Sequence, residues 1–253
     1  MKFILLTLLF LSSCSSRIEV ITPSSNFILP EANGEFANTD LNINNSNGSL
    51  LAITVDELNG DTDSKTSTST MAFGGNMNLG LSKYIDFYSK VSTHSPHLFG
   101  FKIQLKGDPK IKTEKKNLSV AFNMGIGQNK YSGAGAENFG INVGSSDYTL
   151  NRTHTVKEMS VSVGYRFKTE FLTYIHLEKI SEQVNGQIKY EGNPADNKSL
   201  EINGKHLQYT LGVMYFYKVY NWVAEIAMQQ MAWETSNKNN TNTFNLLFGK
   251  NFN

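Results

Sequence analysis

The chain has 253 residues, with 23 basic and 22 acidic side chains and a formal net charge of +1. This balance argues against nucleic acid as a partner, because binding to phosphates requires a concentrated basic face. The single cysteine, Cys14, excludes an intramolecular disulfide and a metal site built from several cysteines.

The first residues have the pattern of a bacterial export signal. Lys2 is followed by an apolar run from Phe3 to Leu11, then by two serines and Cys14. A basic start, an apolar stretch of roughly 7–15 residues and small residues at a cleavage site are typical of a secretory signal. The run is too short for a membrane-spanning helix, which needs about 20 residues. Residues 1–13 are therefore predicted to be a signal peptide.

The segment Leu11-Ser12-Ser13-Cys14 resembles the lipobox of bacterial lipoproteins. This resemblance implies that Cys14 is lipid-modified and becomes the mature N-terminus. Ser15 at the following position is compatible with delivery to the outer membrane. The alternative is a non-lipidated signal in which a cysteine lies near the cleavage site by chance.

The next part of the chain, up to about Gly48, is rich in Ser, Asn and Thr and contains Pro23 and Pro30. It offers little apolar surface to bury, so its composition favours a flexible connection over a packed element. We therefore expect residues 14–48 to form a lipid-anchored tether that precedes a folded region at 49–253.

Beyond Ser49 the apolar residues recur at every second position. In 117–131 the even positions from Leu118 to Ile126 are apolar, whereas the odd positions carry Asn, Ser, Ala and Gly. A strand places such residues on one face, and a helix does not. The same alternation predicts ten strands, with a bulge near Gln229-Gln230 where the phase slips. The predicted strands are 49–58, 68–81, 85–92, 98–106, 117–131, 156–167, 171–189, 205–218, 220–235 and 242–253.

Pairing between neighbouring predicted strands is consistent with this pattern. Tight connections at 168–170 and 218–219 would place Thr173 opposite Tyr165 and Tyr215 opposite Trp222, which brings the apolar faces together. Tight and long connections also alternate, as do the short periplasmic turns and longer outer loops of outer-membrane barrels. Only 107–116 is long on the side expected to be short. With ten strands, both chain ends are predicted to lie on the periplasmic side.

Two stretches, Met71–Leu105 with its tight turn at Ser82-Lys83-Tyr84 and the closing segment Phe244–Phe252, resemble small bacterial outer-membrane β-barrel proteins. The resemblance covers roughly residues 49–253 and implies a fold and a membrane, not an activity. The final aromatic is displaced by one residue, because Asn253 follows Phe252. The expected fold is an all-β, antiparallel up-and-down transmembrane β-barrel of about ten strands, with eight or twelve as alternatives. Small residues on the non-apolar strand faces favour it over a soluble barrel or sandwich on a lipid tether.

The predicted lumen face carries ionisable side chains of both signs. Unpaired charges in a confined lumen are costly, so an internal set of paired charges is the simplest expectation. The functional alternative is a polar pathway or a small ligand site. The candidate lumen polar network consists of Lys102, Glu158, Arg166, His176, Glu178 and Glu225, and Asp86, Lys90 and His206 lie on the same predicted face.

Catalytic and cofactor motifs are not evident in the sequence. His176 and Glu178 share one strand face, which would suit a metal or an acid–base pair, but no third ligand is apparent. Nucleophile-elbow, phosphate-loop and dinucleotide-binding patterns do not occur. We therefore expect no metal, no cofactor and no enzymatic activity. Among the other histidines, His154 falls in a predicted loop, while His206 and Glu182 are candidates for an outer-rim site.

The sequence thus predicts an outer-membrane lipoprotein with a passive or structural role, as a narrow channel or a ligand-holding barrel with outer-membrane lipid as its partner. One alternative is a surface adhesin or receptor in which loops 132–155 and 190–204 bind an extracellular partner or a small solute. A second alternative is a rim-located hydrolase or acyltransferase.

The lipobox generates the first testable prediction. Cys14→Ser should abolish incorporation of labelled fatty acid and leave the precursor unprocessed, because serine lacks the thiol that carries the lipid. Labelling in growing cells and the size of the protein on a gel would show both effects. Normal processing of the variant without lipid label would contradict the lipobox interpretation.

Overall fold

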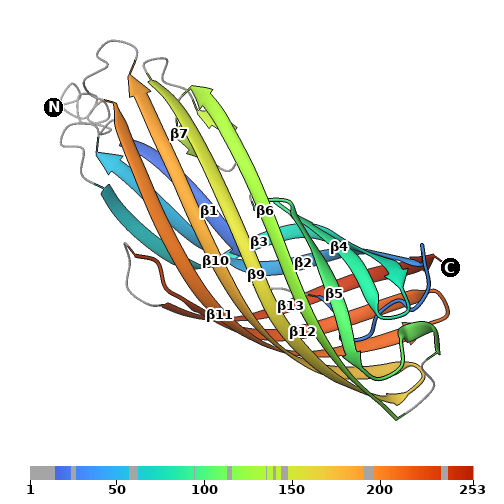
Figure 1. The fold of residues 1–253 in the computed structure, drawn as a ribbon. Coiled ribbons are helices and arrows are strands. Elements are labelled where there is room, and N and C mark those ends of the chain that lie inside the picture. Colours follow the sequence, from blue (N-terminus) through green and yellow to red (C-terminus); the bar gives the residue numbers. More distant parts are fainter. Residues whose placement is uncertain are drawn as a thin grey trace, which may run out of the picture.

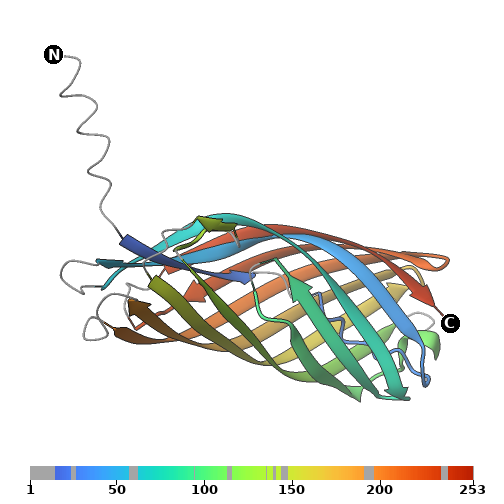
Figure 2. The same ribbon diagram turned by 90° about the horizontal axis from the view of Figure 1, so that it is seen from above.

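Ten antiparallel strands close into a tall barrel, a further strand pairs with the end of one of them, and an extended segment lies inside the barrel (Figures 1 and 2). The computed structural model describes residues 15–23, 27–56, 62–93, 95–112, 116–134, 136–138, 141–143, 148–190, 197–234 and 239–252. The predicted signal peptide and Cys14 lie outside these residues. No helix in the described ranges is long and apolar enough to cross a membrane.

The barrel strands follow one another around the wall in chain order, and pairing of β2 with both β3 and β13 closes the circle. This arrangement confirms the predicted up-and-down barrel of ten strands. The strands are β2 (Thr39–Asp56), β3 (Thr62–Ser82), β4 (Ile85–Ser92), β5 (Leu98–Lys106), β6 (Asn117–Ala134), β9 (Tyr148–Lys168), β10 (Phe171–Tyr190), β11 (Lys198–Tyr217), β12 (Tyr220–Met231) and β13 (Asn239–Phe252). A small hairpin, β7 (Ala136–Asn138) and β8 (Ile141–Val143), lies between β6 and β9 in the chain.

Predicted and observed strands agree in the part of the barrel near the tight turns. Thr173 lies opposite Tyr165 and Tyr215 opposite Trp222, as the sequence pattern required. Strands β4 and β5 have their predicted bounds. The predicted bulge at Gln229-Gln230 is wrong, because β12 keeps an unbroken register with β11 as far as Gln230. The apparent phase slip arises because Met231 is an apolar residue on the inward face.

The strands extend farther from the turns than predicted, so the described residues of the loops predicted at 132–155 and 190–204 are largely strand. β9 begins at Tyr148 and β11 at Lys198. The sequence pattern missed these extensions because their outward residues, such as Thr153 and Glu201, are polar. A strand outside a membrane can pair normally without an apolar outer face.

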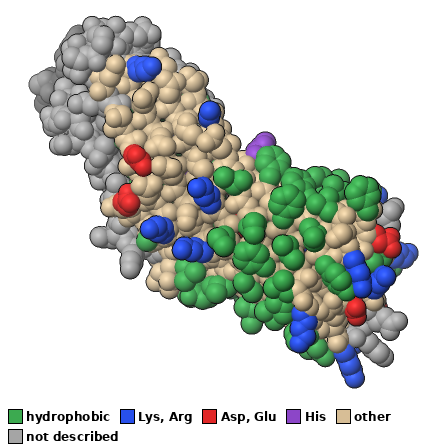
Figure 3. Space-filling model, in the orientation of Figure 1, with side chains coloured by type: hydrophobic (Ala, Val, Ile, Leu, Met, Phe, Trp, Pro, Cys, Tyr) green, Lys and Arg blue, Asp and Glu red, His purple; other side chains and the backbone are tan. Residues whose placement is uncertain are grey.

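Outward-facing apolar side chains form a belt around the half of the barrel nearest the tight turns (Figure 3). Phe101, Leu211, Trp222 and Phe244 are each 47–56% exposed in this belt. Such a band is the surface that a transmembrane barrel presents to lipid. Beyond the belt the outer surface is mostly polar (Figure 3). The barrel therefore spans the membrane with its turn-side half and projects from it with the other half.

The two ends of the ten-strand wall lie together on one side, as predicted, but the described chain begins at the opposite end of the barrel, so the prediction is wrong for its N-terminal side. Strand β1 (Ser15–Pro23) pairs with the far half of β2, where Ser15 lies opposite Asp56. Phe252, by contrast, pairs with Thr39 at the turn side. The chain between β1 and β2 must therefore travel the length of the membrane-spanning half before β2 begins (Figure 1).

Residues 27–34, which we call the lumen segment, make this passage inside the barrel, and all eight are buried. They replace the second part of the tether predicted for 14–48, and β2 begins at Thr39, ten residues before the predicted strand start. A short apolar run explains the difference, because Phe27 and Leu29 pack against Tyr174 and Met214 of the wall. The Ser- and Asn-rich composition of the surrounding sequence concealed this run.

The projecting half of the barrel has an apolar interior of its own. Val20 of β1 and Leu51 of β2 pack against Leu150, Val184 and Trp233 from the facing wall, together with neighbouring buried residues. This cluster fills the barrel at the end away from the tight turns. The lumen segment fills the other end, so side chains occupy the interior at both levels.

The orientation of β6 gives the second prediction. Phe122 points outward between Ile103 and Val161 on neighbouring strands, whereas Asn123 is fully buried and donates a 3.0 Å hydrogen bond to Ser160. Phe122→Arg should lower the free energy of unfolding by about 2–4 kcal/mol if it lies near the bilayer midplane. Asn123→Ala should cost only about 1 kcal/mol. Urea unfolding in lipid vesicles would compare them, and a larger loss for Asn123→Ala would contradict the assigned faces.

Candidate functional site

All six residues of the predicted lumen network point into the barrel, and each is at most 5% exposed. They do not form one continuous network. The structure distributes them over a turn-side cluster around Glu31 and a middle cluster around Glu158 and Glu225. A third cluster, around Glu182, lies in the projecting half and contains none of the six.

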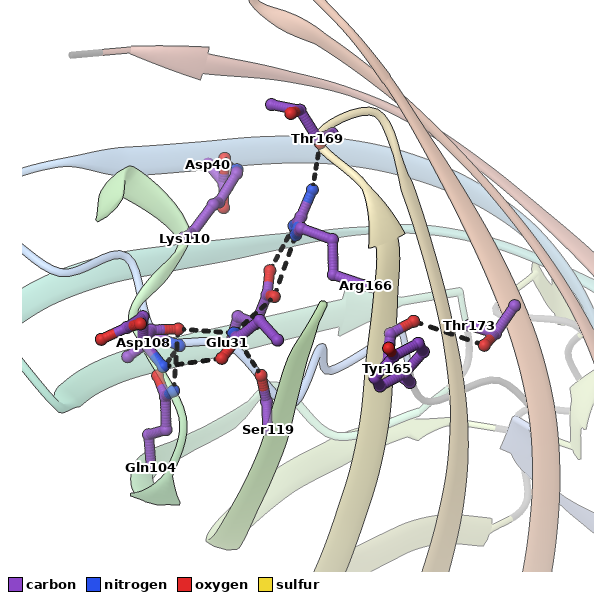
Figure 4. Close-up of polar contacts among 12 residues, drawn as sticks. Glu31, Asp40, Gln104, Asp108, Lys110, Ser119, Tyr165, Arg166, Thr169 and Thr173 are labelled. Atoms are coloured by element: carbon purple, nitrogen blue, oxygen red, sulfur yellow. Dashed lines mark hydrogen bonds and ion pairs between the residues drawn. The ribbon is translucent and has the colours of Figure 1, made fainter. Parts of the chain in front are cut away.

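The turn-side cluster joins the barrel wall to the lumen segment (Figure 4). Arg166 of β9 binds both carboxylate oxygens of Glu31, with Nε 3.0 Å from Oε1 and Nη2 in contact with Oε2. Its Nη1 also donates to the carbonyl oxygen of Thr169 at 2.5 Å. Asn117 adds a 3.2 Å hydrogen bond to Glu31. A bidentate, charge-assisted arrangement of this kind is among the strongest polar contacts in proteins.

The backbone of the same segment is held by further wall residues. Lys102 forms a 2.8 Å ion pair with Asp86 and donates to the carbonyl oxygen of Glu31 at 2.7 Å. Asp86 in turn accepts from the backbone N–H of Asn33 at 3.0 Å. Gln104 accepts from the N–H of Ala32 at 2.7 Å. The wall therefore satisfies main-chain groups that would otherwise be buried without partners.

Residues 107–112, in the connection that the sequence predicted to be long, lie against the turn-side end of the lumen segment. They include a short 3-10 helix, η1 (Lys110–Lys112), whose first backbone N–H donates to the carbonyl oxygen of Ala32 at 2.8 Å. The Lys110 ammonium lies 2.5 Å from Asp40 at the start of β2 (Figure 4). This connection is long because it folds back onto the lumen segment.

In the middle cluster, Lys90 lies 2.9 Å from Glu158 and 3.9 Å from Glu178. Tyr88 donates to Glu158 at 2.7 Å. His176 is buried on the same strand face as Glu178. Charges of opposite sign thus meet at this level of the lumen.

Glu225 belongs to the same level but binds different partners. It accepts from the hydroxyl of Tyr174 at 2.5 Å and from the backbone N–H of Phe27 at 3.1 Å. Glu225 therefore anchors the start of the lumen segment, as Arg166 and Asp86 anchor its later residues.

The third cluster lies beyond the apolar belt. Glu182 binds His154 at 2.8 Å, accepts a 2.7 Å hydrogen bond from Thr22 of β1, and lies 3.8 Å from His206. Burial by itself would raise the pKa of Glu182, but the hydrogen bond and charge of His154, with smaller contributions from His206 and Thr22, lower it. Burial also lowers the pKa of His206, against the opposing charge of Glu182.

A cavity of about 60 Å³ lies between the middle and third clusters. Its charged lining is formed by Lys90, Glu158, Glu178 and Glu182, and it reaches Ser95 in the β4–β5 connection. Within the described parts of the chain, no group of three His, Cys, Asp or Glu residues is placed to hold a metal ion. The chemistry available at this cavity is that of paired ions and hydrogen-bonding groups.

Several important residues were absent from the sequence-based site. His154 was placed in a loop but lies on β9, where it has the inward parity of Glu158 and Arg166. Glu31 lay in the predicted tether, and no pattern in the surrounding sequence marked it as a residue of the lumen. Small inward residues gave an indirect signal, because Gly212 leaves space for Tyr174.

No protein-family model and no curated protein matches the chain. Similar solved structures include the outer membrane protease OmpT from Escherichia coli, at 9% identity and a TM-score of 0.37 over 95% of this chain and 98% of that one. Another is OprD of Pseudomonas aeruginosa, at 8% identity and a TM-score of 0.18 over 90% and 99%. A third is an anion-selective porin from Comamonas acidovorans, at 10% identity and a TM-score of 0.18 over 94% and 100%. Likeness at this level implies no shared activity.

The lowered pKa of His206 gives the third prediction. Unfolded histidine takes up a proton near pH 6.5, whereas folded His206 does so only at lower pH. The free energy of unfolding should therefore fall as the pH drops below about 6.5, until the folded pKa is passed. Denaturant unfolding at pH 7.5 and 5.5 should show a smaller loss for His206→Gln than for the unmodified protein. Equal losses would contradict this assignment.

Proposed function

We propose that this protein is an outer-membrane β-barrel lipoprotein with a structural role, a sealed barrel whose lumen holds a segment of its own chain. The observation that carries this proposal is the passage of residues 27–34 through the membrane-spanning half of the lumen, where Glu31 is bound by Arg166. Of the roles predicted from the sequence, the geometry favours a barrel that holds an occupant in its lumen over a narrow channel. The occupant here is a segment of the same chain.

The width and charge of the lumen support a sealed barrel. Eight strands enclose little beyond their own side chains, whereas 16–18 leave a water-filled channel, so ten strands lie near the filled end of this range. Ion selectivity in channels depends on rings of charge along an open path. Here Lys102 is paired with Asp86 and Arg166 with Glu31, and the lumen segment occupies the space between them.

The outer membrane is the location that best fits the architecture. An apolar belt, tight turns at one end and strands that project at the other end are typical of bacterial outer-membrane barrels. The expected lipid at Cys14 would add an anchor to a protein that already spans the bilayer. The projecting half supports a surface role, but the site for an extracellular partner would then include the polar outer faces of β9, β10 and β11 as well as the connections.

The rim-enzyme alternative rests on the contact between His154 and Glu182. A histidine oriented by a carboxylate can act as a general base. Here, however, Glu182 also accepts a hydrogen bond from the hydroxyl of Thr22 in β1, and the side chain of His154 is only 1% exposed. These contacts favour a role in holding β1, which is paired with β2, against the facing wall.

The fourth prediction tests whether the barrel is sealed. In planar-bilayer recordings the purified protein should show no steady conductance. A variant in which 27–34 is replaced by Gly and Ser residues of equal number should show measurable current, because the side chains that fill the turn-side lumen are removed. Large, steady, porin-like conductance of the unmodified protein would overturn the proposal.

A further inference from the structure

We infer that the barrel displays strand β1 on the outer surface of the membrane, so that Ser15 lies outside the cell and the chain enters the lumen from that side. This inference rests on the proposed outer-membrane location and goes beyond it, because it assigns the side of the membrane that β1 occupies.

The direction of β1 is the first step. Its pairing with β2 runs from Ser15 opposite Asp56 to Pro23 opposite Gly48, so the chain starts at the projecting end and moves toward the membrane. Val20 is fully buried in the apolar cluster of the projecting half, and Thr22 is bound to Glu182. These contacts fix β1 beyond the apolar belt.

The passage through the lumen is the second step. From Phe27, bound to Glu225, the segment continues to Glu31 and Asn33, each held by a different wall residue. The chain then reverses at the turn side, where Ala37 and Gly80 are joined by a 2.9 Å backbone hydrogen bond, and enters β2. The N-terminal region therefore crosses the membrane inside the barrel before the wall begins.

Charge complementarity shows that the wall is built to receive this segment. Arg166 is 3% exposed and its guanidinium is bound to Glu31, while Lys102 is 2% exposed and donates to the Glu31 backbone. Without the segment, Arg166 would lose its carboxylate partner inside the lumen, which is strongly unfavourable. The occupant is thus matched to its site by both charge and hydrogen bonding.

The sidedness of the barrel completes the argument. Tight turns join β3 to β4, β9 to β10 and β11 to β12 at one end, and short turns lie on the periplasmic side of outer-membrane barrels. The projecting end, which holds Ser15, is then external.

Epitope accessibility in intact cells tests this inference. A short peptide tag inserted after Ser16 should bind antibody without permeabilisation, as should a tag in the connection between β10 and β11. A tag after Asn253 should bind only after the outer membrane is opened. If the Ser16 tag is hidden while the β10–β11 tag is exposed, the inference fails and the proposed sealed barrel stands. If the β10–β11 tag is also hidden, the proposed orientation in the outer membrane fails as well.

A matched pair of substitutions tests the seating of the lumen segment, and this is the fifth prediction. Glu31→Ala should raise the rate of proteolysis within 24–38 of the purified protein by roughly tenfold or more, because a buried ion pair is broken and local opening becomes more frequent. Glu35→Ala, at an exposed position four residues away, should leave the rate unchanged. Equal rates for the two variants would overturn the threaded arrangement.

Discussion

The ion pair between Glu31 and Arg166 joins the N-terminal part of the chain to the barrel wall, and much of the interior is arranged around it. Arg166 points into a narrow lumen, where an isolated charge would be costly. Glu31 supplies its partner, and the rest of the lumen segment follows because its backbone groups also need partners at that depth. Lys102, Asp86 and Gln104 provide them. The wall and its occupant are thus mutually dependent.

Different kinds of contact fill the interior in the two halves of the barrel. In the membrane-spanning half, where the outside is apolar, the inside combines ion pairs and the backbone of the lumen segment with the apolar contacts of Phe27 and Leu29. In the projecting half the outside is polar, and the inside is an apolar core around Val20 and Trp233. The cluster of Glu182, His154 and Thr22 lies in the projecting half, next to this core on its membrane side.

How well each part of the structure could be predicted depends on whether its interactions leave a pattern in the local sequence. Alternation along β4 and β5 identified both strands because lipid on one side and a polar lumen on the other impose opposite demands on successive residues. That contrast ends beyond the belt, so the first part of β9, with polar Thr153 outside and His154 inside, carried no comparable pattern. Glu31 was hidden for a different reason. Its role depends on Arg166, 135 residues later in the chain, and no local pattern encodes that distance.

The seam at which Phe252 of β13 meets Thr39 of β2 constrains the order of assembly. Once this seam has formed, the wall is a closed ring, and residues 27–34 could enter it later only by passing through an interior already occupied by Tyr174 and Met214. The lumen segment must therefore be in place as the ring closes around it. The pairing of β13 with β2 completes the ring, and the segment that precedes β2 in the chain is what the ring encloses.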